Sequence, residues 1–435
     1  MKRTNYLSLL LLLTLSLAGC ISSKSISVQD ADLQQALRAI PKVSQVAEKE
    51  SKSYSQKYEL YIEQPLDYSD VSAGTFKQRV FVYHRGFDRP VVLVTEGYAA
   101  DRYDNSGDPS PLASLLGANV VVVEHRYFSK STPDPLNWDY LTVENAANDL
   151  HRITEALKTI YPKKWLSTGI SKGGQTTLFY STFFPNDMAC SVPYVGPLCS
   201  SAADPGPSKY LEQMGTPEER QKIQNFQMEV LKRRARLVPL LEKAIEKQGM
   251  KIRVSMDELF DNMALEYSFA LRQYNETLES MPPLDSDDQT LFNHFITKVG
   301  FDFYRTDGWN GTFFVQAVRE LGFYTYNIEP FKDLLTIKQC DDYVQRVHVP
   351  DGVSYPFDPK VYNKVIDYLK KNDPKILFIY GENDPWTGAA PKLSEGKKNA
   401  KVFIIPGKVH DASVTSLPLE MRIEVVHQIK EWLAD

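Results

Sequence analysis

Two kinds of hydrophobic pattern open the folded part of the chain. Hydrophobic and polar residues alternate over 58–62 and 76–83, as in half-buried antiparallel strands, with turn-forming residues between them. Continuous apolar runs follow at 91–94 and 120–123, and short runs of this kind are typical of parallel strands buried on both faces. The sequence therefore predicts an antiparallel pair joined to a parallel sheet.

Helical and strand patterns alternate after these runs. Apolar residues recur at helical spacing over 145–160, and a short strand is predicted at 165–168. Strand patterns return at 376–380 and 402–405, and an amphipathic helix is predicted over 419–433. Strands that alternate with helices indicate an α/β fold with a mainly parallel sheet.

The region between about 200 and 345 lacks strong strand patterns. The segment 216–219 (Thr-Pro-Glu-Glu) combines an N-cap, a proline at the first helical position and a capping-box glutamate, and predicts a helix to about residue 247. The segment 255–258 (Ser-Met-Asp-Glu) is a second capping box, which opens a helix to about residue 274. We interpret this region as a helical cap inserted into the α/β core.

The N-terminus has the pattern of an export signal. Lys2 and Arg3 precede a Leu-rich run over 6–17, which is shorter than the roughly 20 apolar residues of a membrane span. Cys20 directly follows Leu-Ala-Gly, and this arrangement resembles the lipobox of bacterial lipoproteins, in which the cysteine is acylated. We expect a cell-envelope protein that contacts the membrane through this lipid alone. An ordinary cleaved signal is the alternative.

Composition and charge narrow the class of protein. A hydrophobic content of 43% indicates a globular chain with a sizeable core. The net charge of −5 and the absence of a basic run argue against a nucleic-acid partner. Cys190, Cys199 and Cys340 match no metal-site spacing, and in an exported protein they are compatible with one disulfide and one free thiol. No metal or organic cofactor is expected.

The segment 169–173 (Gly-Ile-Ser-Lys-Gly) carries a Gly-x-Ser-x-Gly motif between a predicted strand and a predicted helix. In the α/β-hydrolase fold this motif is a sharp turn that lifts the serine hydroxyl above the sheet. We expect Ser171 to be the nucleophile of an α/β-hydrolase core with an inserted, mainly helical cap domain. The expected divisions are 1–19 as signal peptide, 20–55 as lipid anchor and tether, 56–197 and 346–435 as the two parts of the core, and 198–345 as the cap.

A serine nucleophile needs a base, and in this fold the acid and the histidine follow the serine in that order. His410 follows the strand pattern at 402–405 and a Pro-Gly turn, where α/β active sites assemble, and is the expected base. Glu382 and Asp384 both follow the strand pattern at 376–380, and either side chain could orient the imidazole. Position in the turn favours Asp384.

Two backbone amides are expected to form the oxyanion hole. One belongs to Lys172, which follows the nucleophile, and the other to Gly97 or Tyr98, after the strand at 91–94. Glu96 lies beside them, where its carboxylate would oppose the developing negative charge unless it binds a cation. A purely structural hydrogen-bonding role for Glu96 is the alternative.

Several segments share a pattern beyond these site residues. They are 64–67 (Gln-Pro-Leu-Asp), 75–79 (Thr-Phe-Lys-Gln-Arg), 96–98 (Glu-Gly-Tyr), 124–128 (Glu-His-Arg-Tyr-Phe), 140–142 (Tyr-Leu-Thr), 169–174, 383–386 (Asn-Asp-Pro-Trp) and 409–411 (Val-His-Asp). In this combination the chain resembles the serine exopeptidases related to prolylcarboxypeptidase and dipeptidyl peptidase II. Within that group it is most similar to the bacterial prolyl tri/tetrapeptidyl aminopeptidases, from about residue 55 to the end and least in the cap.

The resemblance implies release of short peptides, tri- or tetrapeptides often ending in Pro, from the free N-terminus of small peptides. It supports Asp384 over Glu382. It also implies that the cap segment 309–326 faces the active site, so that the expected substrate-binding residues are Glu96, Trp309, Gln316, Glu320, Tyr324 and Trp386. Glu96 or Glu320 is expected to bind the substrate α-ammonium. Packing of the cap helix on the core is the alternative for each cap residue.

Two other functions use the same residues. The first is an esterase or lipase with the same triad, which would require an apolar tunnel for an acyl chain. The second is a non-catalytic peptide-binding lipoprotein, against which the complete set of Ser, Asp and His argues.

Overall fold

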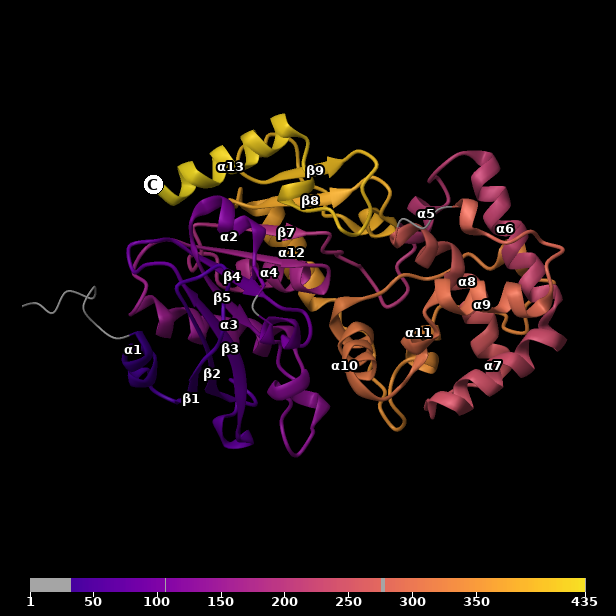
Figure 1. The fold of residues 1–435 in the computed structure, drawn as a ribbon, viewed down its shortest axis with the longest axis horizontal. Coiled ribbons are helices and arrows are strands. Elements are labelled where there is room, and N and C mark those ends of the chain that lie inside the picture. Colours follow the sequence, from indigo (N-terminus) through magenta and orange to yellow (C-terminus); the bar gives the residue numbers. More distant parts are fainter. Residues whose placement is uncertain (1–32, 106, 275–277, 435) are drawn as a thin grey trace, which may run out of the picture.

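The computed structural model describes residues 33–105, 107–274 and 278–434. The predicted signal peptide and the lipidation site Cys20 lie outside the described residues. The strands of the described part form one sheet in the order β1-β2-β3-β5-β4-β6-β7-β8-β9, and a region of helices lies beside this sheet (Figure 1).

The sheet is antiparallel at one side and parallel over the rest. The predicted strand pair is confirmed as β2 (Gln56–Pro65) and β3 (Thr75–His84), which pair antiparallel. β3 also runs antiparallel to β5, after which every pairing is parallel. The remaining strands are β1 (Val43–Glu48), β4 (Val91–Thr95), β5 (Asn119–Val123), β6 (Trp165–Ile170), β7 (Cys190–Tyr194), β8 (Leu377–Gly381) and β9 (Lys401–Ile405).

Helices cover both faces of the sheet, which explains the continuous apolar runs. In β4, Val91 and Leu93 pack on the face covered by α1 (Leu33–Ala39) and α3 (Val143–Lys158). Val92 and Val94 pack on the opposite face, under α2 (Pro111–Leu116) and α13 (Leu419–Ala434). Side chains alternate along a strand, so both sets must be apolar. α4 (Lys172–Phe183) and α12 (Lys360–Lys371) contact each other.

The expected tether contains folded structure. Residues 33–55 include α1 and β1, and β1 pairs with β2 as an edge strand. Leu33 and Leu37, one helical turn apart, are buried with Val46 in the core of the sheet. The tether interpretation was therefore wrong for this segment, because a few well-spaced apolar residues outweigh its polar composition once they are buried.

The cap region is helical, as predicted, and lies between β7 and β8. Its helices are α5 (Gly206–Leu211), α6 (Pro217–Lys232), α7 (Arg234–Gln248), α8 (Met256–Gln273), α9 (Asp288–Val299), α10 (Gly308–Gln316) and α11 (Tyr343–Val347), and α10 continues as a π-helical turn over Ala317–Leu321. The long helix predicted to residue 247 is interrupted at Arg233, whose guanidinium donates to the carbonyls of Leu284 and Ser286. None of the helices within the described residues has both the length and the apolar character needed to cross a bilayer.

The three described cysteines form no disulfide. Cys190, Cys199 and Cys340 are free and buried. Cys190 lies in β7 within the apolar layer that also contains α13, whereas the other two belong to the core of the cap side. The expected disulfide is therefore absent among these residues, and their burial is that of small hydrophobic side chains.

Candidate active site

Ser171 occupies a sharp turn between β6 and α4. Its φ of 56° lies in the left-handed region, which is uncommon for a residue other than glycine. A Cβ on Gly169 would lie 2.3 Å from the carbonyl oxygen of Gly173, and one on Gly173 would lie 2.6 Å from that of Thr95. The motif therefore requires both glycines because backbone passes within contact distance of each.

The three expected catalytic side chains are joined by hydrogen bonds. Nε2 of His410 lies 2.9 Å from Oγ of Ser171, and its Nδ1 lies 2.7 Å from Oδ2 of Asp384. Asp384 is fully buried, and its Oδ1 accepts a hydrogen bond from the backbone N–H of Trp386. This is the geometry that allows an imidazole to take a proton from a serine hydroxyl.

The alternative acid, Glu382, points elsewhere. Its carboxylate accepts a hydrogen bond of 2.9 Å from the backbone N–H of Gly407, in the turn after β9. Glu382 thus shapes the loop that leads to His410, while Asp384 orients the imidazole ring. Position in the turn and the family resemblance favoured Asp384, and its hydrogen bond to His410 agrees with that prediction.

The loop after β4 lies against the start of α4, as expected for an oxyanion hole. A Cβ added at Gly97 would lie 2.6 Å from the backbone nitrogen of Gly173 and 2.7 Å from the carbonyl carbon of Lys172. The backbones of Gly97 and Lys172 therefore face each other closely beside Ser171. Tyr98 contributes its ring to the adjacent cleft.

The side chain of Lys172 is buried among aromatic rings. Its Nζ lies 5.2 Å from the centre of the Phe128 ring and 5.7 Å from that of Tyr98, and no described residue accepts a hydrogen bond from it. Burial holds the pKa of Lys172 well below its ordinary value. The predicted role of Lys172 is that of its backbone N–H as an oxyanion donor. Burial of its side chain does not change that prediction.

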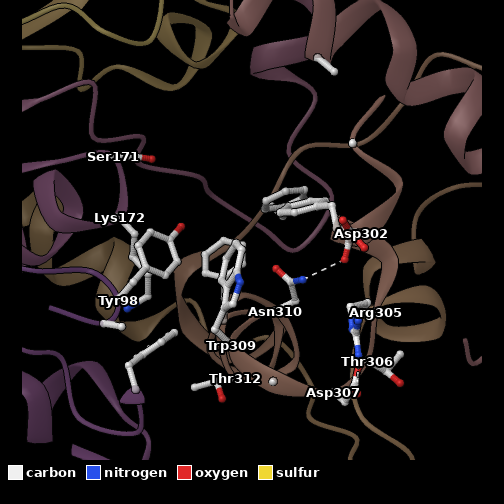
Figure 2. A pocket seen from close by; sticks show the side chains of 18 of the residues that line it. Tyr98, Ser171, Lys172, Asp302, Arg305, Thr306, Asp307, Trp309, Asn310 and Thr312 are labelled. Atoms are coloured by element: carbon white, nitrogen blue, oxygen red, sulfur yellow. Dashed lines mark hydrogen bonds and ion pairs between the residues drawn. The ribbon is translucent and has the colours of Figure 1, made fainter. Parts of the chain in front are cut away.

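A cleft of about 1570 Å³ opens at Ser171 and His410 and extends beneath the helical region. Figure 2 shows the rings of Tyr98 and Trp309 between Ser171 and a polar end with Asp302, Arg305 and Asp307. The two ring centres are 5.4 Å apart, so the core and the cap meet here through aromatic contact. A cleft with apolar walls and few polar groups is typical of a site for small ligands.

The profile of one family, described as PS-10 peptidase S37, matches residues 26–434. The chain belongs to peptidase family S37. It is therefore a serine peptidase with the α/β-hydrolase fold, and this membership decides against the esterase and the non-catalytic alternatives.

Two curated relatives of this S37 peptidase carry the names of peptidases. The chain is 30% identical to a prolyl tri/tetrapeptidyl aminopeptidase from Streptomyces mobaraensis over 94% of its own length and 86% of the relative. It is 32% identical to a thymus-specific serine protease from Mus musculus over 32% of its length and 30% of that protein. The first similarity confirms the resemblance seen in the sequence.

Two solved structures have a distant similarity to this chain. A peroxisomal α/β-hydrolase from Saccharomyces cerevisiae has a TM-score of 0.41 at 12% identity, covering 88% of this chain and 89% of that one. A proline iminopeptidase from Mycobacterium smegmatis has a TM-score of 0.39 at 13% identity, covering 86% and 100%. The fold of the S37 peptidase rests on its own strand order, not on these distant likenesses.

The structure brings three of the six expected substrate-binding residues to the cleft. They are Trp309, which is half exposed, and the buried Tyr324 and Trp386. Trp386 lies beside the proposed base, with its ring centre 6.3 Å from that of His410.

Gln316 does not reach the cleft. It lines a separate small cavity together with Lys172, His125 and residues of α3 and α4. The face of α10 that carries Gln316 packs on the core, whereas the face with Trp309 and Phe313 borders the cleft. The structure therefore gives no support to the expectation that Gln316 contacts substrate.

The two glutamates expected to bind the substrate amine are also occupied elsewhere. Oε1 of Glu96 accepts hydrogen bonds from Arg102 at 2.5 Å and from the Tyr103 hydroxyl at 2.6 Å. Oε2 of Glu320 accepts one of 2.7 Å from the backbone N–H of Val143, at the start of α3. Neither residue lines the cleft, so the structure gives no support to either as the amine-binding group. Pairing with Arg102 also explains how a carboxylate is tolerated next to the oxyanion loop.

One group of described side chains has the spacing of metal ligands. His151, Glu155 and Asp187 each offer a ligand atom, and these atoms lie within 4.8 Å of one another. His151 and Asp187 are already hydrogen-bonded, and the Tyr180 hydroxyl donates to the same Asp187 oxygen. None of the three lines the cleft of the S37 peptidase, so they lie apart from the proposed chemistry.

Sequence reasoning named none of the four acidic residues that line the cleft in the described part of the chain, and one of these, Glu266, is buried. Glu266 lies in α8 within the otherwise largely apolar stretch 263–271, and it lines the cleft together with Ala270 and Gln273. A carboxylate in the middle of an apolar helical pattern was the available signal. It carries no motif, and only the tertiary structure turns that face of α8 toward the active site.

Proposed function

We propose that this S37 peptidase releases short peptides, of three or four residues and often ending in Pro, from the free N-terminus of small peptides. The observation that carries the proposal is the hydrogen-bonded series Asp384, His410 and Ser171, which opens into a cleft bordered by helices. The similarity to a prolyl tri/tetrapeptidyl aminopeptidase over most of both chains supports this substrate class.

The first step forms an acyl-enzyme. Oγ of Ser171 attacks the scissile carbonyl carbon while Nε2 of His410 takes the hydroxyl proton, and the buried carboxylate of Asp384 stabilises the resulting imidazolium. The carbonyl oxygen becomes an oxyanion, which the amides of Lys172 and of Gly97 or Tyr98 bind. His410 then donates the proton to the leaving nitrogen, and the C–N bond breaks.

The second step returns the free enzyme. Water attacks the ester carbon as His410 takes one of its protons, and the second tetrahedral intermediate collapses with return of the proton to Oγ of Ser171. The peptide that carried the free N-terminus leaves with a new carboxyl group. Every proton transfer passes through the one imidazole that contacts both Ser171 and Asp384.

The helical region supports a preference for small substrates. Trp309 and Phe313 of α10 and Tyr274, next to the end of α8, line the same cleft as Ser171. A folded protein chain would have to displace these elements, whereas a short peptide fits within about 1570 Å³.

The test compares peptides of graded length with free and acetylated N-termini, read by mass spectrometry. We expect an intact tri- or tetrapeptide to be released from the free-amine series, with strong discrimination against acetylated peptides. The variant S171A is the control and should release nothing. Cleavage at equal rates in both series would contradict exopeptidase action.

We also propose that acylated Cys20 anchors this peptidase to the cell envelope. The proposal rests on the Leu-Ala-Gly-Cys sequence after the apolar run. Radiolabelled palmitate should be incorporated into the parent chain and not into the variant C20S, which should appear in the soluble fraction. Equal labelling of both chains would overturn the assignment of Cys20.

A further inference from the structure

Four carboxylates line the cleft within the described residues, and only one of them is buried without a basic partner. Asp101 is paired with Arg79, and Asp307 with Arg305. Asp302 is exposed at the polar end of the cleft. Glu266, the fourth, is 6% exposed and forms no ion pair with any described residue.

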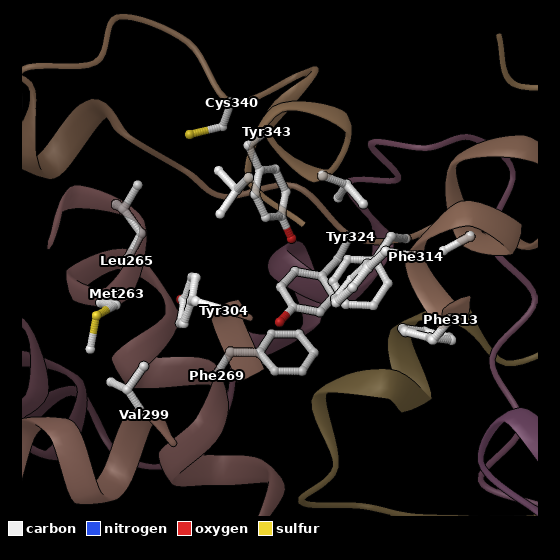
Figure 3. Close-up of a cluster of buried hydrophobic side chains, with 14 of the residues drawn as sticks. Met263, Leu265, Phe269, Val299, Tyr304, Phe313, Phe314, Tyr324, Cys340 and Tyr343 are labelled. Atoms are coloured by element: carbon white, nitrogen blue, oxygen red, sulfur yellow. The ribbon is translucent and has the colours of Figure 1, made fainter. Parts of the chain in front are cut away.

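The carboxylate of Glu266 is held in one orientation by two phenols. The hydroxyl of Tyr324 donates to its Oε2 at 2.5 Å, and that of Tyr326 donates to the same oxygen at 2.8 Å. Tyr324 is itself fixed by stacking on Phe269, with ring centres 3.8 Å apart (Figure 3). No described residue donates a hydrogen bond to the second oxygen, Oε1, and that oxygen is not among the fully buried unpaired atoms. Oε1 is therefore available to a ligand in the cleft.

We propose that Glu266 binds the α-ammonium group of the substrate and so makes the S37 peptidase require a free N-terminus. This inference rests on the proposed function and adds the residue that enforces it. A buried carboxylate without a cation is costly, and an ammonium that donates to Oε1 would supply the missing charge and hydrogen bond together.

Glu266 and the catalytic residues Ser171 and His410 line the same cleft. Ring contacts lead from the catalytic histidine to Glu266: the His410 and Trp386 centres are 6.3 Å apart, and the Trp386 and Tyr324 centres are 5.0 Å apart. The Tyr324 hydroxyl then contacts Glu266 directly. Three to four extended residues span about 10–14 Å. We expect a peptide of this length to lie between Ser171 and the ammonium site at Glu266.

Burial among apolar and phenolic side chains raises the pKa of the Glu266 carboxyl group, so that a bound cation would favour the ionised form. Burial raises its pKa to about 7, and the hydrogen bonds from Tyr324 and Tyr326 oppose that rise. Among the described residues, the titratable groups that interact with Glu266 are phenols. Burial raises the pKa values of Tyr304, Tyr324, Tyr326 and Tyr343, and the exposed Tyr274 also has a raised pKa. A substrate ammonium would thus be the first cation to contact this carboxylate.

The variant E266Q tests the proposal, because it keeps the shape and removes the charge. We measure kcat/KM for Ala-Ala-Pro-p-nitroanilide with a free and with an acetylated N-terminus. E266Q should lose about 30-fold or more on the free-amine substrate, as expected when one partner of a buried charge pair is removed. Its activity on the acetylated substrate should change far less, so that the preference for the free amine disappears.

The matched control is E320Q, which removes a partly buried glutamate that does not line the cleft. E320Q should retain the full preference for the free amine. If the parent enzyme shows no such preference, the proposed function fails. If the parent has the preference and E266Q retains it, only the role of Glu266 is wrong. Loss of the preference in D302N instead of E266Q would place the anchor at the exposed end of the cleft and overturn the proposal.

A second variant covers the case in which E266Q does not fold. Y326F removes one of the two hydrogen bonds to Glu266 and should raise the pKa of that carboxyl further. The preference for the free amine should then develop at a higher pH than in the parent, while cleavage of the acetylated substrate keeps its pH profile. Identical profiles for both substrates in Y326F and the parent would contradict the inference.

Discussion

Replacing Gly97 by alanine would add one carbon atom where the oxyanion loop meets the turn after Ser171. That Cβ would lie 2.6 Å from the backbone nitrogen of Gly173 and 2.6 Å from the Cβ of Lys172. Carbon atoms normally approach to about 3.5–4.0 Å, so the loop and the turn must separate by roughly 1 Å. Because the proposed oxyanion donors lie on the two sides of this contact, the substitution pulls them apart.

The expected loss of kcat in G97A follows from the fact that the oxyanion forms only as the substrate reacts. Loss of one oxyanion donor lowers kcat by about 10²–10³-fold. The ground-state carbonyl does not depend on both amides, so KM should change little. We expect G97A to lose kcat by this factor on Ala-Ala-Pro-p-nitroanilide, with near-normal KM in steady-state kinetics.

The control is a glycine substitution that strains the backbone away from the site. Gly249 ends α7 with φ 57°, and a Cβ there would meet no heavy atom within 4 Å. G249A should cost about 1 kcal/mol of stability from its left-handed conformation and leave kcat unchanged. If G97A keeps kcat within about threefold of the parent while remaining folded, the Gly97 loop does not stabilise the transition state.

Three further outcomes follow from the site. D384N should lower kcat by about 10⁴-fold, because the amide no longer holds the His410 tautomer; normal kcat would exclude Asp384 as the acid. Burial raises the pKa of Glu320 from 4.5 to about 7. The protonated side chain therefore contributes to the free energy of unfolding below pH 4.5, the pKa of the unfolded state, and this contribution is lost as the pH rises toward 7. Urea denaturation should therefore show the parent losing stability relative to E320Q between these pH values, and parallel curves would contradict this. The ratio of kcat/KM for the free-amine substrate to that for the acetylated substrate should rise with pH through about 7, because Glu266 ionises there. The ratio should fall again near about pH 8, where the substrate amine loses its proton. A ratio that does not change with pH would contradict the role of Glu266 in binding the ammonium group.

The sequence determined the parts of this protein that depend on neighbours along the chain. The apolar runs at 91–94 and 120–123 predicted buried parallel strands, because a strand covered on both faces needs apolar residues at every position. The Gly-x-Ser-x-Gly turn and the loop position of His410 identified side chains that the structure places within hydrogen-bond distance. Such motifs encode local backbone geometry, which a single segment specifies by itself.

Other features were decided by contacts between distant segments. Residues 33–48 appeared to be a tether until their few apolar side chains were seen packed on the sheet. Glu382 and Asp384 follow the same strand. The sequence favoured Asp384, and the path of the loop after β9 gives the physical reason, because it directs Glu382 to Gly407 and Asp384 to His410.

The residue proposed to bind the substrate α-ammonium is the clearest case in which the sequence was not sufficient. Glu96 and Glu320 stood out in the sequence by their neighbours, but Arg102 and the start of α3 occupy their carboxylates. Glu266 lies in a segment without a motif, and it reaches the cleft because α8 packs against Tyr324 and Tyr326. Which face of a cap helix borders the active site depends on tertiary packing across the whole insertion, and no local pattern encodes it.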